Sequence, residues 1–182
     1  MNKKIAIIGG GNLGTAIAEG LIQSGFVQAK HILVTKRNIQ TLHGLEQKGV
    51  LVSDKNEEAL RYADLVILAV KPFQVNDILG SLRDEFKEAK HVLVSVVTGI
   101  SIGSIASIIG KKVPIVRAMP NTAIAIQESM TCLAAHNAND DQLQYVQDIF
   151  DQLGKAVKID EKLMDAATVL GACGTAFAMR YI

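Results

Sequence analysis

The chain alternates short apolar runs rich in β-branched residues with segments in which apolar residues recur at helical spacing. The first run, Ile5–Ile8, predicts a buried strand, and the apolar residues from Leu13 to Leu21 then share one helical face that Gly25 can end. Further strands are predicted at His31–Val34, Val50–Val52, Leu65–Val70, Val92–Val97, Val113–Val116, Met130–Ala135 and Ala156–Ile159.

Helical segments separate these strands. They comprise a polar segment from Ile39 to Lys48, a short one near Glu57–Arg61, and apolar stripes at Val75–Phe86, Ile102–Ile109 and Leu143–Leu153. This alternation predicts an α/β fold, a doubly wound Rossmann-type sheet that is mostly parallel and has helices on both faces. After Asp160 the pattern is helical and rich in small residues. We therefore expect an α/β domain at 1–160 and, at 161–182, a helical segment that is cut off.

Composition and charge narrow the class of partner. The chain has 182 residues, 49% of them hydrophobic, and its 19 basic and 18 acidic residues give a net charge of +1. This balance gives no electrostatic case for binding nucleic acid or a membrane surface. Val92–Gly110 is uncharged, but its serines, threonine and glycines favour a strand, loop and helix over a membrane span. We expect a small-molecule partner, a cytoplasmic location and, from two isolated cysteines and four scattered histidines, no metal site.

The strongest local signal is the segment Gly9-Gly10-Gly11-Asn12-Leu13-Gly14, which matches GxGxxG between a predicted strand and a predicted helix. In dinucleotide-binding folds the first glycine makes a tight turn, the second lets the backbone approach a pyrophosphate, and the third lets helix and strand pack closely. The start of the helix then presents free N–H groups to the anion. The alternative is a glycine-rich packing turn without a ligand.

The end of the second strand predicts which dinucleotide binds. NAD-binding domains place an acidic residue there for the ribose 2′-hydroxyl. Here the residues are Thr35-Lys36-Arg37-Asn38, in which two cations and a hydroxyl suit a 2′-phosphate. We therefore expect NADP as the cofactor, with NAD possible. A solvated loop whose charges bind nothing is the alternative.

Polar or turn-forming clusters follow three other strands, at Lys71-Pro72, Val97-Thr98-Gly99 and Ala118–Thr122. Ligands of open α/β sheets lie beyond these carboxyl ends. Lys71 is either a cofactor contact or a surface charge. Met119 and Asn121 are candidates for the substrate side, although Asn121 also suits a turn after Pro120. No catalytic triad or paired carboxylates occur, which agrees with hydride transfer, where the cofactor carries the chemistry.

Three segments, Ile8–Gly14, Leu68–Pro72 and Arg117–Thr122, resemble pyrroline-5-carboxylate reductases in order and spacing, and the resemblance covers essentially the whole chain. It implies NAD(P)H-dependent reduction of 1-pyrroline-5-carboxylate to L-proline, the last step of proline synthesis. It also implies a set of residues around the cofactor: Ile8, Gly9, Gly10, Gly11, Asn12, Leu13, Thr35, Lys36, Arg37, Asn56, Ala69, Val70, Lys71, Pro72, Val96, Val97 and Thr98.

The chain departs from this family at three points. Ala123 stands where the family usually has proline, and Gly171–Ala176 replaces Ser-Gly-Ser-Gly-Pro-Ala. Family members also continue into a helical domain that forms the dimer and carries a threonine thought to act near the substrate. The resemblance thus implies an NAD(P)-binding Rossmann domain at 1–160 and, at 161–182, the first helix of a truncated helical dimerisation domain. The chain resembles the cofactor half of a homo-oligomeric enzyme, and no catalytic residue can be assigned to it. Alternatives are another Rossmann-group reductase, of the F420-dependent NADP reductase or β-hydroxyacid dehydrogenase type, and a non-catalytic NADP-binding sensor.

Overall fold

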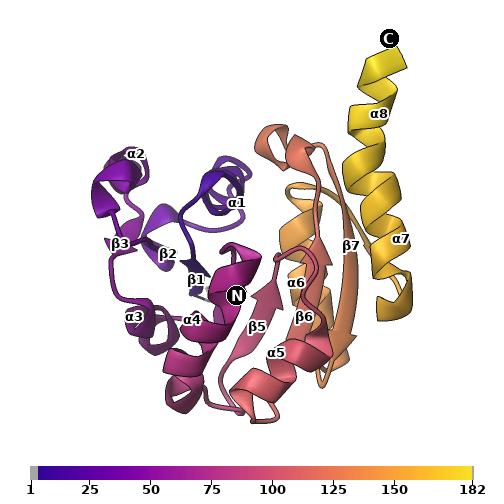
Figure 1. The fold of residues 1–182 in the computed structure, drawn as a ribbon. Coiled ribbons are helices and arrows are strands. Elements are labelled where there is room, and N and C mark those ends of the chain that lie inside the picture. Colours follow the sequence, from indigo (N-terminus) through magenta and orange to yellow (C-terminus); the bar gives the residue numbers. More distant parts are fainter. Residues whose placement is uncertain (1–3, 182) are drawn as a thin grey trace.

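The computed structural model describes residues 4–181, which form one eight-stranded sheet in the order β3-β2-β1-β4-β5-β6-β7-β8 (Figure 1). The strands are β1 Ile5–Ile8, β2 Ile32–Thr35, β3 Leu51–Ser53, β4 Leu65–Leu68, β5 Val92–Ser95, β6 Ile115–Met119, β7 Ser129–His136 and β8 Gly154–Lys158. Strands β1 to β6 are parallel, β7 runs antiparallel to β6, and β8 is parallel to β7. The predicted Rossmann-type, mostly parallel sheet is confirmed.

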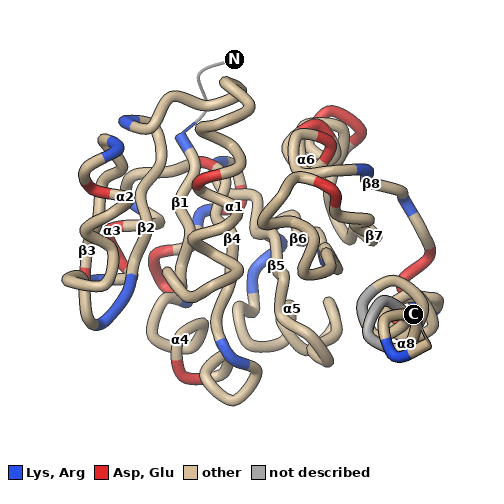
Figure 2. The backbone as a smooth tube through the Cα atoms, turned by 90° about the horizontal axis from the view of Figure 1, so that it is seen from above, with Lys and Arg blue, Asp and Glu red and all other residues tan. Residues whose placement is uncertain are grey.

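Helices cover both faces of the sheet. They are α1 Asn12–Gln23, α2 His43–Gln47, α3 Asn56–Tyr62, α4 Val75–Leu82, α5 Ile102–Ile109, α6 Asp140–Asp151, α7 Met164–Thr168 and α8 Gly174–Tyr181. One apolar core lies between the sheet and α1, α2 and α6, and a second lies between the sheet and α3, α4, α5 and the start of α7. Figure 2 shows the strands in a row, with α1 and α6 on one side, α4 and α5 on the other, and α8 apart at the end.

Strands β1, β2, β4 and β5 are buried along their whole length. A parallel strand with helices on both faces has no solvated side, so its sequence reads as a continuous apolar run instead of alternating. This is why Ile5–Ile8 and Leu65–Leu68 were recognisable as strands. Their carboxyl ends all meet at one edge of the sheet, where the glycine loop and α1 begin.

Several predicted boundaries were wrong. The expected helix from Ile39 to Lys48 is a 3-10 turn at Ile39–Leu42 followed by the five residues of α2. The strand expected at Val113–Val116 begins at Ile115, because Pro114 has no N–H to donate to the sheet. Phe86 is buried as predicted but lies beyond α4, after a 3-10 turn at Arg83–Glu85.

The uncharged stretch Val92–Gly110 forms β5, a loop and α5. Within residues 4–181, no helix combines the length and the apolarity that crossing a bilayer requires.

The C-terminal segment begins with a 3-10 turn at Glu161–Leu163 and continues through α7, a π-helical turn at Val169–Cys173 and α8. Met164 is buried against the sheet, whereas Leu170 is 78% and Phe177 64% exposed. Figure 1 shows α8 standing beyond the edge of the sheet. The division into 1–160 and 161–182 stays a prediction, and residues 1–3 and 182 lie outside the described part of the chain.

His91 is the one histidine, among those in the described residues, that lies in the core. Its Nδ1 accepts a hydrogen bond from the Lys87 backbone N–H at 3.0 Å, and its Nε2 lies 2.9 Å from the Leu60 carbonyl oxygen. A neutral ring that carries its proton on Nε2 satisfies both contacts. Burial lowers the pKa of His91, because the charged ring would lose its hydration.

Candidate cofactor-binding site

A cavity of about 770 Å³ opens at the carboxyl edge of β1, β2, β4 and β5. All the residues predicted to surround the cofactor line it, together with Asn38, Asp54, Gln74 and Ile78. These residues come from five separate stretches of the chain, which the parallel strands bring to the same edge of the sheet. The geometry therefore collects the predicted residues, and their role in binding is a proposal that we argue below.

The three glycines that match the GxGxxG motif meet different demands. Gly9 has a φ of +109°, and a Cβ on Gly9 would run into the carbonyl group of Ala69. A Cβ on Gly14 would run into the carbonyl oxygen of Gly9, so Gly14 allows α1 to lie against the loop. A Cβ on Gly11 would meet no atom within 4 Å. Gly9 and Gly14 are thus required by the fold, whereas Gly11 keeps the space of the cavity free.

The first turn of α1 has the electrostatic features that favour an anion. Gly11 precedes the helix and offers no side-chain cap, and the first turn contains no acidic residue. The first N–H groups of a helix have no intrahelical acceptor and form the positive end of its dipole. The N–H groups of Gly9 and Gly10 are already bonded to the Thr35 carbonyl oxygen at 3.0 and 2.9 Å. The N–H groups that begin α1 are therefore the ones left for a ligand.

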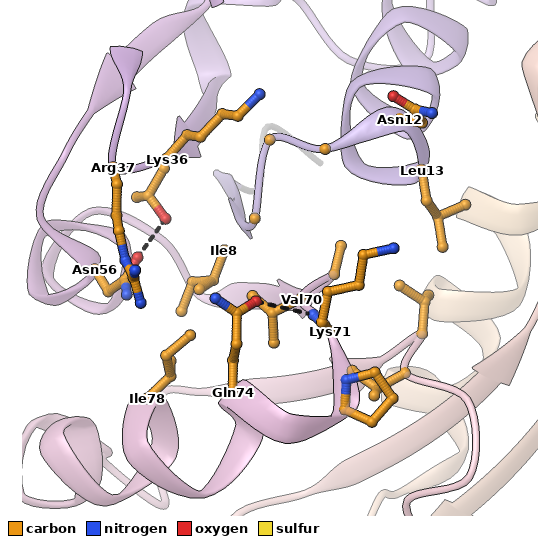
Figure 3. A pocket seen from close by; sticks show the side chains of 18 of the residues that line it. Ile8, Asn12, Leu13, Lys36, Arg37, Asn56, Val70, Lys71, Gln74 and Ile78 are labelled. Carbon is orange, nitrogen blue, oxygen red and sulfur yellow. Dashed lines mark hydrogen bonds between the residues drawn. The ribbon is translucent and has the colours of Figure 1, made fainter. Parts of the chain in front are cut away.

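The end of β2 supplies positive charge. Lys36 is half-buried and Arg37 is exposed, and both line the cavity (Figure 3). Thr35 behaves differently from our expectation that its hydroxyl faces a 2′-phosphate. It is fully buried, and its Oγ1 donates to Asn56 Oδ1 at 2.6 Å. This bond orients the Asn56 side chain so that its amide nitrogen, and not the Thr35 hydroxyl, is the available donor.

Figure 3 shows Lys36, Arg37 and Asn56 on one side of the cavity and Asn12 and Leu13 on the opposite side. The cationic side follows β2, where dinucleotide folds place the adenosine ribose. The cavity then extends past the glycine loop to the ends of β4 and β5. The extent of the cavity and the position of its positive groups thus match an extended ligand that carries one anionic group at an end and another near its middle.

Lys71 lies at the end of β4 in a turn that its own backbone helps to hold. Its N–H donates to Gln74 Oε1 at 3.2 Å, and the Gln74 N–H donates to the Lys71 carbonyl oxygen at 2.9 Å. The Lys71 side chain is exposed and lines the cavity, as Figure 3 shows. This position agrees with either role considered for Lys71, a cofactor contact or a surface charge.

Sequence reasoning missed four lining residues. Asp54 follows the third predicted strand, so the strand-end rule that selected Lys71 could have selected it as well. Asn38 directly follows the Thr35–Arg37 segment. Ile78 belongs to an apolar helical stripe and was expected to be core, yet it is half-buried and faces the cavity. Gln74 carried no signal in the sequence.

Met119 and Asn121 do not line this cavity. The Asn121 side chain is used locally: its Oδ1 accepts from the Ala123 N–H, and its Nδ2 donates to the Gly171 carbonyl oxygen, both at 3.1 Å. Met119 Sδ lies 4.0 Å from the Thr98 hydroxyl, which is at the rim of the cavity. A substrate-side role for Met119 and Asn121 stays a prediction.

Comparisons with known proteins agree with this geometry. A family model described as an NADP oxidoreductase, coenzyme F420-dependent, matches residues 4–99. Pyrroline-5-carboxylate reductase 1 of Dictyostelium discoideum is 41% identical over 98% of this chain, which covers 34% of that protein. A solved structure of a pyrroline-5-carboxylate reductase from Coxiella burnetii gives a TM-score of 0.95 at 31% identity, covering 100% of this chain and 68% of that one. The structure of the Plasmodium falciparum pyrroline carboxylate reductase, solved with NADP bound, gives a TM-score of 0.88 at 27% identity and covers 99% of this chain and 66% of that one.

The fold and the cavity define a Rossmann-type nucleotide-binding domain, and the match over residues 4–99 places it among the NADP-dependent oxidoreductases. That match ends before the Arg117–Thr122 segment, whereas the match to the Coxiella burnetii structure covers the whole of this chain and includes it. Within this class, the chain belongs to the pyrroline-5-carboxylate reductase family. It spans 34% to 66% of the length of several curated relatives.

Proposed function

We propose that this chain binds NADPH and supplies the cofactor half of an enzyme that reduces 1-pyrroline-5-carboxylate to L-proline. The observation that carries the proposal is the cavity at the start of α1, which gathers the glycine loop, Lys36 and Arg37, and the ends of β4 and β5. Support comes from the family relatives, one of which is solved with NADP bound. The same proposal includes that the enzyme is a homo-oligomer and that it is located in the cytoplasm.

The residues present fit the dinucleotide. The space beside Gly11 is open, and the uncapped start of α1 would receive the pyrophosphate without an acidic residue nearby in the first turn. Lys36 and Arg37, with the Asn56 amide nitrogen, would hold the 2′-phosphate by charge-assisted hydrogen bonds. When bound, NADPH supplies the hydride that the carbon of the C=N bond accepts.

The other role that we propose for this chain is to orient the bound cofactor. Val96 and Val97 are buried at the end of β5 and line the cavity with apolar surface, which excludes water from the end of the site farthest from Lys36 and Arg37. Positioning of this kind can contribute about 7–11 kcal/mol to a bimolecular reaction. No group of this chain is assigned to hold or protonate the imine, so we expect the chain alone to bind NADPH without useful turnover.

Titration of the chain with NADPH, followed by cofactor fluorescence, tests the cofactor half of the proposal. A steady-state assay with 1-pyrroline-5-carboxylate, on this chain and on the full gene product, tests the reaction. Turnover by the full product and binding alone by the chain is the expected result. Binding of NADPH by the full product without turnover of this substrate would instead favour another reductase or a sensor.

A further inference from the structure

Arg117 is a charged side chain in the core of the sheet that the proposed chemistry does not use. It lies on β6, and its side chain is 6% exposed. In the strand register it sits between Ser95 of β5 and Ala134 of β7, whose small side chains leave room for a guanidinium group on that face. Arg117 Nε has no hydrogen-bond partner among the described residues. A buried cation of this kind costs free energy, so stability alone does not explain it.

The two acidic partners of Arg117 both come from the C-terminal segment. Nη1 lies 3.5 Å from Glu161 Oε1, and Nη2 lies 3.6 Å from Asp165 Oδ1. Glu161 is one-third exposed, whereas Asp165 is 93% exposed, so the Glu161 contact is screened far less by solvent. The Arg117 guanidinium therefore contacts the 3-10 turn before α7 through Glu161 and α7 itself through Asp165.

Glu161 also accepts a hydrogen bond from α5, the helix that follows the cavity-lining residue Thr98 in the chain. Its Oε1 accepts the Ile102 N–H, at the start of α5, at 2.7 Å. Helix α5 begins four residues after Thr98, which lines the cavity. One carboxylate thus joins the sheet, the helix beside the cavity and the C-terminal helices.

We propose that Arg117 and Glu161 are positioning residues that hold the C-terminal helices in a fixed orientation relative to the β5 end of the cofactor cavity. This rests on the proposed function, in which the groups that bind the imine lie outside the cofactor half. Apolar contacts such as that of Met164 are not directional, and they allow a helix to shift or rotate. The Glu161 carboxylate contacts both the Arg117 guanidinium and the Ile102 N–H, and these two directional contacts select one arrangement. Fixing one arrangement is a role that buried ion pairs have in some proteins.

The test is hydrogen–deuterium exchange of this chain and its Arg117→Met and Glu161→Ala variants. Methionine fills much of the arginine volume, and replacing a buried charge with an apolar side chain often leaves a fold as stable or more stable. We expect amides of residues 161–181 to exchange about tenfold faster or more, because local opening of this segment is released while the sheet stays closed. Asp165→Asn, which removes the exposed partner, is the matched control and should exchange as the parent does.

The expected pattern is faster exchange in α7 and α8 with unchanged exchange in β1, β4 and β5. Parent-like exchange in α7 and α8 of folded Arg117→Met and Glu161→Ala, or equal acceleration in the sheet, would overturn the proposal. If Arg117→Met does not fold, Glu161→Ala alone decides, because its side chain is partly exposed.

Turnover by the full gene product separates positioning from a purely structural role. With Arg117→Met we expect kcat to fall about 10–100-fold while KM for NADPH is unchanged, and Arg117→Lys to recover part of the loss. An unchanged kcat would overturn the positioning role. Failure of the parent chain to bind NADPH would refute the proposed function and leave the exchange result intact, so the two failures are distinguishable.

Discussion

Replacing Lys36 and Arg37 with alanine should weaken NADPH binding while leaving NADH binding unchanged. NADH lacks the 2′-phosphate, and these two cations are the ones that line the β2 side of the cavity. A hydrogen bond to a charged group contributes about 1.5–3 kcal/mol. Arg37 is exposed and Lys36 half-buried, so the lower figure applies to each, about tenfold in Kd.

The double variant should lose less than the sum of the two single losses, because neighbouring side chains that share one phosphate are not independent. We expect about 2 kcal/mol, or roughly thirtyfold in the Kd of NADPH. Arg37→Asp should go further and reverse the preference in favour of NADH, since a carboxylate repels the 2′-phosphate and can accept from a 2′-hydroxyl.

The assay is a fluorescence titration with each cofactor at one stated salt concentration, because exposed charges are screened. Lys55→Ala is the control matched to each single variant: it removes one positive charge from a residue that does not line the cavity. It should change both affinities by less than about twofold. An equal loss for NADPH and NADH in the double variant, or no loss for either, would refute the reasoning about the 2′-phosphate.

Three further predictions concern the loop, the core and the C-terminal helix. Gly11→Val should weaken NADPH binding by about a hundredfold or more at a nearly unchanged Tm, because a Cβ at this position meets no protein atom within 4 Å and the side chain would occupy ligand space. Retained binding in a folded variant would make the loop a packing turn. Because the pKa of His91 is lowered, the contribution of its neutral ring to the free energy of unfolding is complete above about pH 6.5 and is lost as the pH falls further. The free energy of unfolding should therefore depend less on pH between pH 7 and 5 in His91→Gln than in the parent, whereas the exposed His43→Gln should behave as the parent does. Because Leu170 and Phe177 are exposed, we expect the chain to associate on a sizing column in a concentration-dependent way. The double variant Leu170→Gln with Phe177→Gln should associate less, and identical elution of variant and parent would contradict this prediction.

Much of the fold could be predicted from the chain because its signals are local. A run such as Ile5–Ile8 is apolar without interruption, which occurs where helices cover both faces of a parallel strand. The glycine loop is equally local, since its three glycines act within six residues of one turn. Boundaries were less predictable: α2 has five residues although the polar segment from Ile39 to Lys48 reads as a longer helix.

Residues of the candidate site divide in the same way. Lys36 and Arg37 could be selected because they follow a predicted strand, and the carboxyl ends of parallel strands meet at one edge. The hydroxyl of Thr35 could not be assigned correctly, because its partner Asn56 lies 21 residues away. Gln74 and Ile78 line the cavity only because α4 begins beside it, which no periodicity reveals.

The sequence by itself therefore determined the order of strands and helices along the chain, the apolar core and the position of the proposed anion site, since each depends on residue types at short spacing. Only the tertiary structure decided that β7 runs antiparallel to β6 and that Arg117 meets Glu161, 44 residues further along the chain. Contacts of this kind depend on strand register and on the angle at which helices pack. Neither leaves a local pattern, because a buried arginine and a surface glutamate look the same in sequence whether or not the fold brings them together.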